Sequence, residues 1–310
     1  MKRYLLLTVF GLLSLGLTII GCDSSDSSNE SNPLIGDTSS ENFQFVQDEV
    51  GEGAFNTIGY SLDLSFDFID QIPGAPTSPK QKNLVSYSAS DSVQSNHQYT
   101  YDTLNGWHIF QFEATIYEDT DVISIAGTDS IQVTIDGDPM RYPDSTMNGI
   151  KIRNWFEFDV NSDDDAHGEG HHSYDIDATQ YEVDGTGSID GMTEEYLSVY
   201  TADSNATCTL LVENNVTIND VILMVDSPDD GCPQSGSVVV SSGLSLNCTG
   251  NGEGGLSSLS IDGTWTMTAQ FNGTSETYTF SDGTTTWTIT EPCDDPQTIS
   301  SPFKGIRFNK

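Results

Sequence analysis

The sequence predicts an all-β protein, built either as an antiparallel β-sandwich or as a curved open meander sheet with few or no helices. Three observations support this prediction. Apolar and polar side chains alternate along several segments, which places the apolar ones on a single face of a strand. Asn-Gly and Asp-Gly pairs stand between such segments, where tight hairpin turns favour them. We expect no long helix, because no segment stands out by the apolar spacing of three and four that marks an amphipathic one.

The first elements expected after the N-terminal region are strands. Leu62, Leu64, Phe66 and Phe68 alternate with polar residues, which predicts a half-buried strand over this segment. Segment 131–135 shows the same alternation. These patterns favour antiparallel pairing, in which one face of the sheet is buried and the other meets water.

Further strands are expected in the middle of the chain. Segment 150–160 alternates in the same way, with Asn154 as its one polar interruption. Segment 192–202 fits either a short helix or a strand, and its Tyr and Val content does not decide between them. A weak boundary at 203–206 leaves open whether the β-rich domain, predicted to cover 43–303, consists of one unit or two β units.

Two hairpins are expected near the C-terminus. Asn272-Gly273 and Asp282-Gly283 are the expected central pairs of two-residue type I′ turns, because both positions of such a turn need a positive φ. This register would place Met267, Tyr278 and Trp287 in one cross-strand row. We interpret these aromatic side chains as core residues rather than as a ligand platform.

The composition excludes two classes of protein. Of 310 residues, 47 are Asp or Glu and 10 are Lys or Arg, which gives a formal net charge of −37. Because nucleic acid is bound by neutralising its phosphates with Lys and Arg, we expect no nucleic-acid partner. Aromatic residues make up 10% and hydrophobic residues 35%, which is too many for a chain that is disordered throughout. We therefore expect a folded, strongly acidic protein.

The first residues are typical of a targeting segment. A basic start is followed by an apolar run over 4–20, which ends in Ile19-Ile20-Gly21-Cys22. These four residues resemble the lipobox of bacterial lipoproteins. The resemblance implies a signal peptide over 1–21, cleavage before Cys22, and lipid, with palmitate as an acyl chain, on the Cys22 thiol. An uncleaved membrane anchor is the alternative.

Lipidation at Cys22 would hold the protein at a membrane, because each buried CH₂ contributes about 0.8 kcal/mol. We therefore expect an exported protein of the bacterial cell envelope, lipid-anchored in the outer membrane and facing the periplasm or the surface. Asp23 resembles the inner-membrane retention signal of enteric bacteria, so the choice between the two membranes stays open. The Ser- and Asp-rich segment 22–42 is interpreted as a flexible tether.

The cysteines agree with export. Besides Cys22 there are four, an even number, at Cys208, Cys232, Cys248 and Cys293. In an exported protein such a set predicts two disulfides, with three pairings open. A four-thiolate zinc site would need closely spaced pairs, but the consecutive gaps are 24, 16 and 45 residues.

Segment 159–172 is the candidate cation site, because every second residue in it is of a ligand type. These residues are Asp159, Asn161, Asp163, Asp165, His167, Glu169 and His171. An extended chain would place them on one face, and Gly168 and Gly170 would let a loop fold around a metal. The first half resembles the start of a calcium-binding loop, whose carboxylate oxygens suit a hard ion.

The candidate cation site departs from known metal motifs. An EF-hand is rejected, because Asp164 stands where the turn glycine belongs and Gly170 where the bidentate glutamate belongs. The histidines of the segment would suit a transition metal instead. A solvated acidic hairpin loop is the simplest alternative. Among metal ions, the sequence favours calcium over a transition metal at this segment.

The sequence does not identify catalytic residues. A Gly-x-Ser-x-Gly motif is absent, and 47 acidic residues offer too many pairs to single out two carboxylates for glycoside hydrolysis. We therefore expect a non-enzymatic binding or structural role in the envelope, with cation binding as one form of it. A carrier of an apolar ligand in a curved sheet is one alternative, and an extracellular glycan or ester hydrolase is another. Whether the partner is a protein, a glycan or a small molecule stays open, and no family is recognised beyond Cys22.

Overall fold

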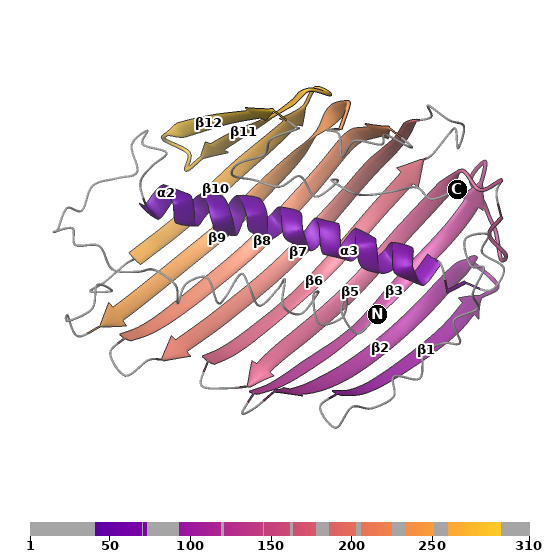
Figure 1. The fold of residues 1–310 in the computed structure, drawn as a ribbon, viewed down its shortest axis with the longest axis horizontal. Coiled ribbons are helices and arrows are strands. Elements are labelled where there is room, and N and C mark those ends of the chain that lie inside the picture. The colour runs from indigo at the N-terminus through magenta and orange to yellow at the C-terminus, as the bar shows by residue number, and fades with distance from the viewer. Residues whose placement is uncertain are drawn as a thin grey trace.

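One antiparallel sheet forms the body of the protein (Figure 1). The computed structural model describes residues 41–69, 71–72, 93–118, 121–144, 146–161, 164–177, 186–202, 206–224, 233–250 and 260–292. Within these residues the strands are β1 (Val93–Asp102), β2 (Trp107–Glu118), β3 (Asp121–Ile135), β4 (Asp138–Pro139), β5 (Gly149–Asn161), β6 (Asp164–Asp177), β7 (Thr186–Ala202), β8 (Ala206–Met224), β9 (Ser235–Gly250), β10 (Ser260–Phe271), β11 (Ser275–Ser281) and β12 (Thr286–Pro292).

The strands are connected as a meander. Their order in the sheet is β1-β2-β3-β5-β6-β7-β8-β9-β10-β11-β12, and β4 pairs with β3. Each pair is antiparallel, and β1 and β12 end the path without pairing to each other. The predicted all-β class is confirmed. In the described part of the chain its form is an open meander sheet rather than a sandwich.

A helical run lies diagonally across one face of the sheet, which we call the inner face (Figure 1). It consists of α2 (Glu41–Val46), the π-helical turn η2 (Gln47–Glu52) and α3 (Gly53–Ile69). The prediction of a strand over Leu62–Phe68 is therefore wrong. Side chains at a spacing of four face the sheet and are buried, which is the stripe of an amphipathic helix. They are Val46, Val50, Ala54, Ile58 and Leu62.

The helix packs against strands from both ends of the sheet. Near its start, the ring of Phe43 lies 5.4 Å from that of Phe280 on β11 and 5.2 Å from that of Trp287 on β12. Near its end, Phe68 stacks on Phe110 of β2 at 4.7 Å. Each of these aromatic side chains is buried, and burial of one such side chain contributes about 1.5 to 3 kcal/mol. A single helix therefore ties the first strands to the last.

The middle strands agree with the predicted alternation. Segment 131–135 lies in β3 and segment 150–160 in β5, with their apolar side chains toward the helix. Segment 192–202, left open between helix and strand, belongs to β7. Strands β7 and β8 pair with each other along most of their length, so the sheet is continuous across the possible boundary at 203–206.

The two C-terminal hairpins form, but each turn lies one position later than predicted. The positive φ angles are at Gly273 (83°) and Gly283 (87°), which are the first central residues of their turns. The side-chain oxygen of Asn272 accepts hydrogen bonds from the backbone N–H of Thr274 (3.1 Å) and Ser275 (2.8 Å). Because Asn272 stabilises the turn from the preceding position, the predicted type I′ turn centred on Asn-Gly is wrong.

The strand register shifts by two residues as a consequence. Met267 pairs with Phe280, and Phe280 pairs with Trp287, so the predicted row with Tyr278 in the middle is wrong. Side chains alternate with a period of two, and a shift of two therefore leaves each one on its predicted face. Met267, Tyr278, Phe280 and Trp287 are all buried, as expected of core residues.

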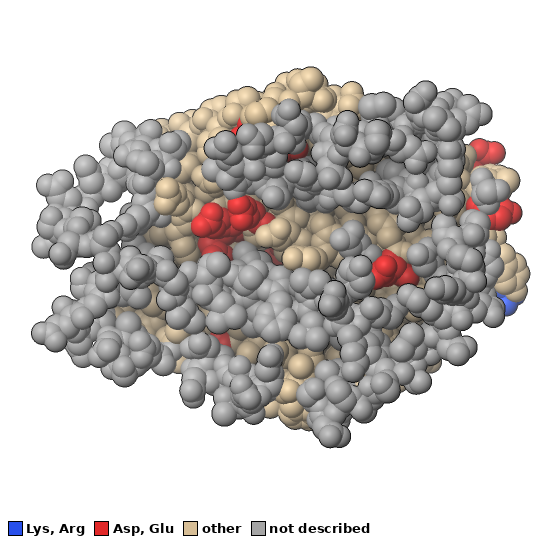
Figure 2. Space-filling model, viewed as in Figure 1, with Lys and Arg blue, Asp and Glu red and all other residues tan. Residues whose placement is uncertain are grey.

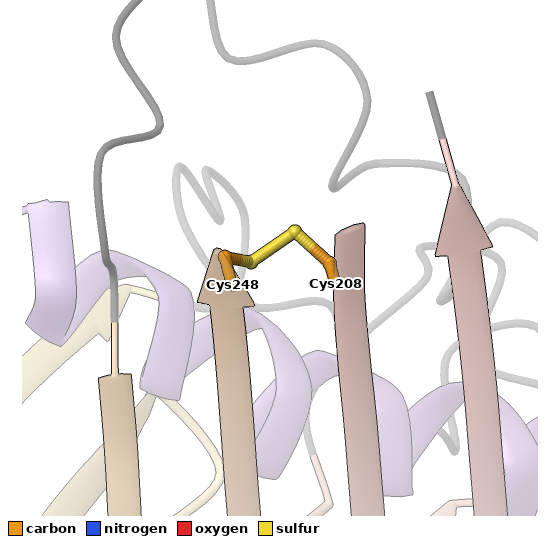
Figure 3. The surroundings of a disulfide bond; sticks show 2 residues. All are labelled: Cys208 and Cys248. Carbon is orange, nitrogen blue, oxygen red and sulfur yellow. A yellow bond between two sulfur atoms is a disulfide. The ribbon is translucent and has the colours of Figure 1, made fainter. Parts of the chain in front are cut away.

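One disulfide lies within the described residues. Cys208 on β8 and Cys248 on β9 are direct cross-strand partners, and their sulfur atoms are bonded (Figure 3). This bond excludes the two pairings in which Cys208 or Cys248 would join another cysteine. Cys232 and Cys293 lie outside the described residues, as do Cys22 and the tether up to residue 40, so those predictions stay predictions.

No helix in the described ranges is both long enough and apolar enough to cross a membrane.

Candidate functional site

The predicted cation segment lies on the outer face of the sheet, opposite the helix. Strands β5 and β6 form the hairpin that carries it, and Asp163 in the connection lies outside the described residues. The other six members are exposed or half-buried and share this face, as expected for an extended chain. They are Asp159, Asn161, Asp165, His167, Glu169 and His171.

Few contacts link these six residues. Asp159 and His167 are direct cross-strand partners, and Oδ1 of Asp159 lies 2.8 Å from Nδ1 of His167. Among the described residues, no group of three or more His, Cys, Asp and Glu side chains is arranged to hold a metal ion. Because Asp163 is not described, the cation site stays a prediction.

The two glycines of the segment do not form a metal-binding loop. Gly168 and Gly170 lie inside β6 and point to the inner face, where the rings of Phe158 and Phe156 cover them. A Cβ atom at Gly168 would lie 2.3 Å from the Phe158 ring, and one at Gly170 would lie 2.6 Å from the Phe156 ring. These glycines therefore make room for aromatic side chains of the neighbouring strand.

An acidic hollow of about 420 Å³ adjoins the segment. We call it the outer hollow. Glu113 of β2 and Glu157 and Asp159 of β5 line it, with the small side chains of Ser124 and Ala126 on β3 between them. No Lys or Arg is among its lining residues. Such a surface attracts cations, which agrees in kind with the predicted cation segment.

A second group of polar residues, which the sequence analysis missed, lies between the helix and the inner face. We call it the polar cluster. Four of its members are successive cross-strand partners on β3, β5, β6 and β7, and the others come from α3 and β7. Its members are Ser61, Ser65, Asp129, Asn154, His172, Thr193 and Glu195.

Ser61 is the centre of the polar cluster. Its Oγ lies 2.7 Å from Nδ2 of Asn154, which donates to it, and 2.7 Å from Nδ1 of His172. On the other side of the imidazole, Nε2 of His172 lies 3.4 Å from Oε1 of Glu195. In the tautomer with the proton on Nε2, His172 accepts a hydrogen bond from Ser61 and turns its N–H toward the Glu195 carboxylate. Ser61 and His172 are both buried.

Asp129 and Ser65 form the other half of the polar cluster. Asp129 is fully buried, and its Oδ2 lies 2.7 Å from the Ser65 hydroxyl, which also lies 3.0 Å from the carbonyl oxygen of Ser61. The one proton of the Ser65 hydroxyl is therefore directed toward two acceptors, the Asp129 carboxyl and the Ser61 carbonyl. Burial raises the pKa of Asp129 to about 7, and the hydrogen bond from Ser65 opposes this shift.

A small pocket of about 30 Å³ lies beside the polar cluster, between the helix and strands β5 to β8. We call it the inner pocket. Glu49 of η2, Glu195 of β7 and Asn214 of β8 supply its polar groups, and its apolar wall includes Phe156 and Phe158. Burial, together with the negative charge of Asp48, raises the pKa of Glu49 to about 8.

The sequence did contain two signals for the polar cluster. Asn154 interrupts an otherwise apolar strand face, and it proves to be the residue that donates to Ser61. Thr57, Ser61 and Ser65 follow one another at a spacing of four, which places them on one side of the helix. Neither pattern indicates a buried cluster unless residues 53–69 are known to form a helix that covers the sheet.

Comparisons with protein families, with curated proteins and with solved structures found no match for this chain.

Proposed function

We propose that this chain is an exported, lipid-anchored protein of the bacterial envelope with a non-enzymatic binding role, and that the inner pocket is its binding site. The observation that carries the binding role is the set of acceptor atoms at this pocket. Within the described part of the chain, Oε2 of Glu49, Oε1 of Glu195 and Oδ1 of Asn214 are buried without a hydrogen-bond partner. A buried polar group without a partner costs about 1 to 3 kcal/mol, which a bound donor would offset.

Export is supported by the Cys208–Cys248 disulfide. Disulfides form and persist in oxidising compartments such as the periplasm and are rare in the cytosol. The anchor itself rests on the lipobox resemblance at Ile19-Ile20-Gly21-Cys22. Together they support a domain held at a membrane by an N-terminal lipid.

The anchor is tested by metabolic labelling of the full chain in a bacterial host with radioactive palmitate. Wild-type protein should carry label and sediment with the membranes. Cys22→Ala should abolish the label, because the thiol that takes the lipid is gone. Label that persists in Cys22→Ala would refute the anchor, and Cys208→Ala serves as the control that leaves the label in place.

The carrier of an apolar ligand receives less support. In the described residues the inner face is covered by the buried apolar stripe of the helix, and the larger of the two pockets described above is lined by carboxylates. Carrier pockets of the kind considered are deep and mostly apolar. The acceptor atoms of the inner pocket instead favour a ligand with hydrogen-bond donors.

Hydrolysis is the second candidate function, because Ser61, His172 and Glu195 follow one another as a nucleophile, base and orienting acid would. However, Ser61 is 7% exposed on the side of the helix that faces the sheet, and it lines neither pocket. A substrate carbonyl therefore has no described place beside its Oγ. Covalent labelling of Ser61 by a fluorophosphonate probe would favour hydrolysis over binding.

The binding role is tested by thermal unfolding of the mature domain in the presence of four probe classes. These are methylammonium, calcium, acetate and a medium-chain fatty acid. At least one class should raise Tm in a concentration-dependent way, because a ligand that binds only the folded state stabilises it. Asn214→Leu, which fills the inner pocket, should remove the shift, whereas Glu213→Gln on the exposed face of β8 should retain it. A panel without any shift would refute the binding role.

A further inference from the structure

The inner pocket has room for one small polar group. Its volume of about 30 Å³ exceeds the roughly 10 to 15 Å³ that one water-sized guest needs. Gly53 and Thr57 on the helix line one side, and Phe156, Phe158 and Val212 on the strands line the other. The Thr57 hydroxyl already donates to the carbonyl of Gly53 at 3.1 Å, so it offers the pocket only acceptor capacity. The site is therefore compact and rich in acceptors.

Three of these acceptors have no hydrogen-bond partner among the residues that the structure describes. Glu49 is 2% exposed and Asn214 is 6% exposed, and in each a side-chain oxygen has no hydrogen bond. The third oxygen, on Glu195, has only the 3.4 Å approach of His172. A carboxylate or amide oxygen accepts hydrogen bonds, so the guest that fits must donate about three of them.

The charge around the pocket favours a cation. Asp48 and Glu195 accompany Glu49 at or beside the pocket, and among the described residues that line or contact it no Lys or Arg is found. On the helix side, acidic side chains gather over the N-terminal half of the helix, whereas Lys or Arg shows at one edge only of the described surface in view (Figure 2). A negative surface of this kind raises the local concentration of cations.

We propose that the inner pocket binds a primary ammonium group, with Glu49, Glu195 and Asn214 each accepting one of its N–H bonds. This inference rests on the proposed binding role and adds the chemical class of the ligand. A primary ammonium has three donors and no acceptor, which matches the three free oxygens one to one. The rings of Phe156 and Phe158 complete the site, because an aromatic wall attracts a desolvated cation.

The donor count separates this ligand from other cations. Calcium takes six to eight oxygen ligands, whereas only three oxygens at the pocket lack a hydrogen-bond partner among the described residues. A quaternary ammonium would suit the aromatic wall but has no N–H to give to the three oxygens. The ammonium group itself could belong to a free amine or to the head group of an aminophospholipid, and both present the same donors.

The experiment is calorimetric titration of the mature domain at pH 7 with methylammonium, tetramethylammonium and calcium as probes. We expect methylammonium to bind and the other two not to compete with it. Glu49→Gln keeps the shape of the side chain but removes its charge, and it should weaken methylammonium binding by about tenfold or more. The outer-face variant Glu213→Gln should bind like wild type.

Proton release provides a second readout. Glu49 has a pKa of about 8 without ligand, so at pH 7 it holds a proton that a bound cation would displace. The binding heat should therefore depend on the ionisation enthalpy of the buffer in wild type and lose that dependence in Glu49→Gln. Binding without proton release in wild type would overturn the role of Glu49.

The outcomes separate the two proposals. If methylammonium does not bind but another probe class stabilises the domain through Asn214, the ammonium inference fails and the binding role stands. If no probe class binds, both fail. Equal affinity for tetramethylammonium would also overturn the inference. Ethanolamine and phosphatidylethanolamine vesicles then distinguish the sources: a lipid head group should bind from the vesicle, whereas a free amine should bind only as ethanolamine, and the absence of both contradicts the inference.

Discussion

Replacing Asp129 with Asn should stabilise the protein by about 2 to 4 kcal/mol at pH 8 and change its stability little at pH 4. The carboxyl is fully buried, and its one hydrogen bond in the polar cluster comes from Ser65. A buried carboxylate is costly, whereas a neutral amide of the same shape can donate to the Ser65 hydroxyl. The variant therefore removes a charge that the folded state disfavours.

The direction of the pH effect follows from the pKa of Asp129. Folding raises it from 3.8 to about 7, so the folded state binds more protons than the unfolded state between these values. The contribution of Asp129 is then fully present below pH 4 and is lost as the pH rises through 7. One pKa unit corresponds to about 1.4 kcal/mol of folding free energy. A rise of about three pKa units therefore gives the upper end of the stabilisation expected for Asp129→Asn. Burial of Glu49 acts in the same direction.

The measurement is urea unfolding of wild type and Asp129→Asn at several values between pH 4 and 9. The two curves of stability against pH should separate as the pH rises. Asp262→Asn, at an exposed position on β10, is the control and should run parallel to wild type. A constant difference between Asp129→Asn and wild type across the range would contradict the buried-charge account.

Removal of the Cys208–Cys248 bridge should lower stability by roughly 2 to 5 kcal/mol. The two cysteines are separated by 40 residues, and the bond limits the unfolded chain over that loop. Both residues are buried and point toward the core, so the double variant Cys208→Ala, Cys248→Ala also loses packing. The loss should be greatest for β8 and β9, the two strands that the bond joins.

Guanidinium unfolding of this double variant and of wild type under oxidising conditions measures the loss in the free energy of unfolding. Cys208→Ala alone should lose nearly as much as the pair, because either change breaks the bond. If the double variant unfolds at the same denaturant concentration as wild type, the bridge does not constrain the unfolded chain as expected.

The sheet was predictable because its signals are local. Over 131–135 in β3 and 150–160 in β5 the inner-face residues recur at every second position and are apolar except for Asn154, and that pattern needs no knowledge of the rest of the chain. The helix was missed because Leu62, Leu64, Phe66 and Phe68 alternate by chance at its end, while the spacing of four that begins at Val46 crosses several polar and glycine residues. The spacing of four is visible only when 46–62 is considered as a whole.

The turns and the polar cluster show a different limit. Placing Asn272 inside or before its turn depends on two backbone hydrogen bonds, and the dipeptide alone does not reveal them. Ser61 meets Asn154 and His172 from 93 and 111 residues away, which only the folded sheet brings about. Short-range patterns could thus predict the faces of the strands but not what covers them.

The position of the helix also sets an order of folding. Each strand finds its partner a few residues away, so hairpins can form as the chain emerges, and such local contacts form fast. The helix comes before these strands in the chain, yet Phe43 contacts the rings of Phe280 and Trp287, more than 230 residues later. A chain that crosses a membrane N-terminus first would therefore hold the Phe43 end of the helix without these ring contacts until its final hairpin had arrived. Apolar surface that is exposed during that interval promotes aggregation, so the order of the elements favours a chain that folds with chaperone protection.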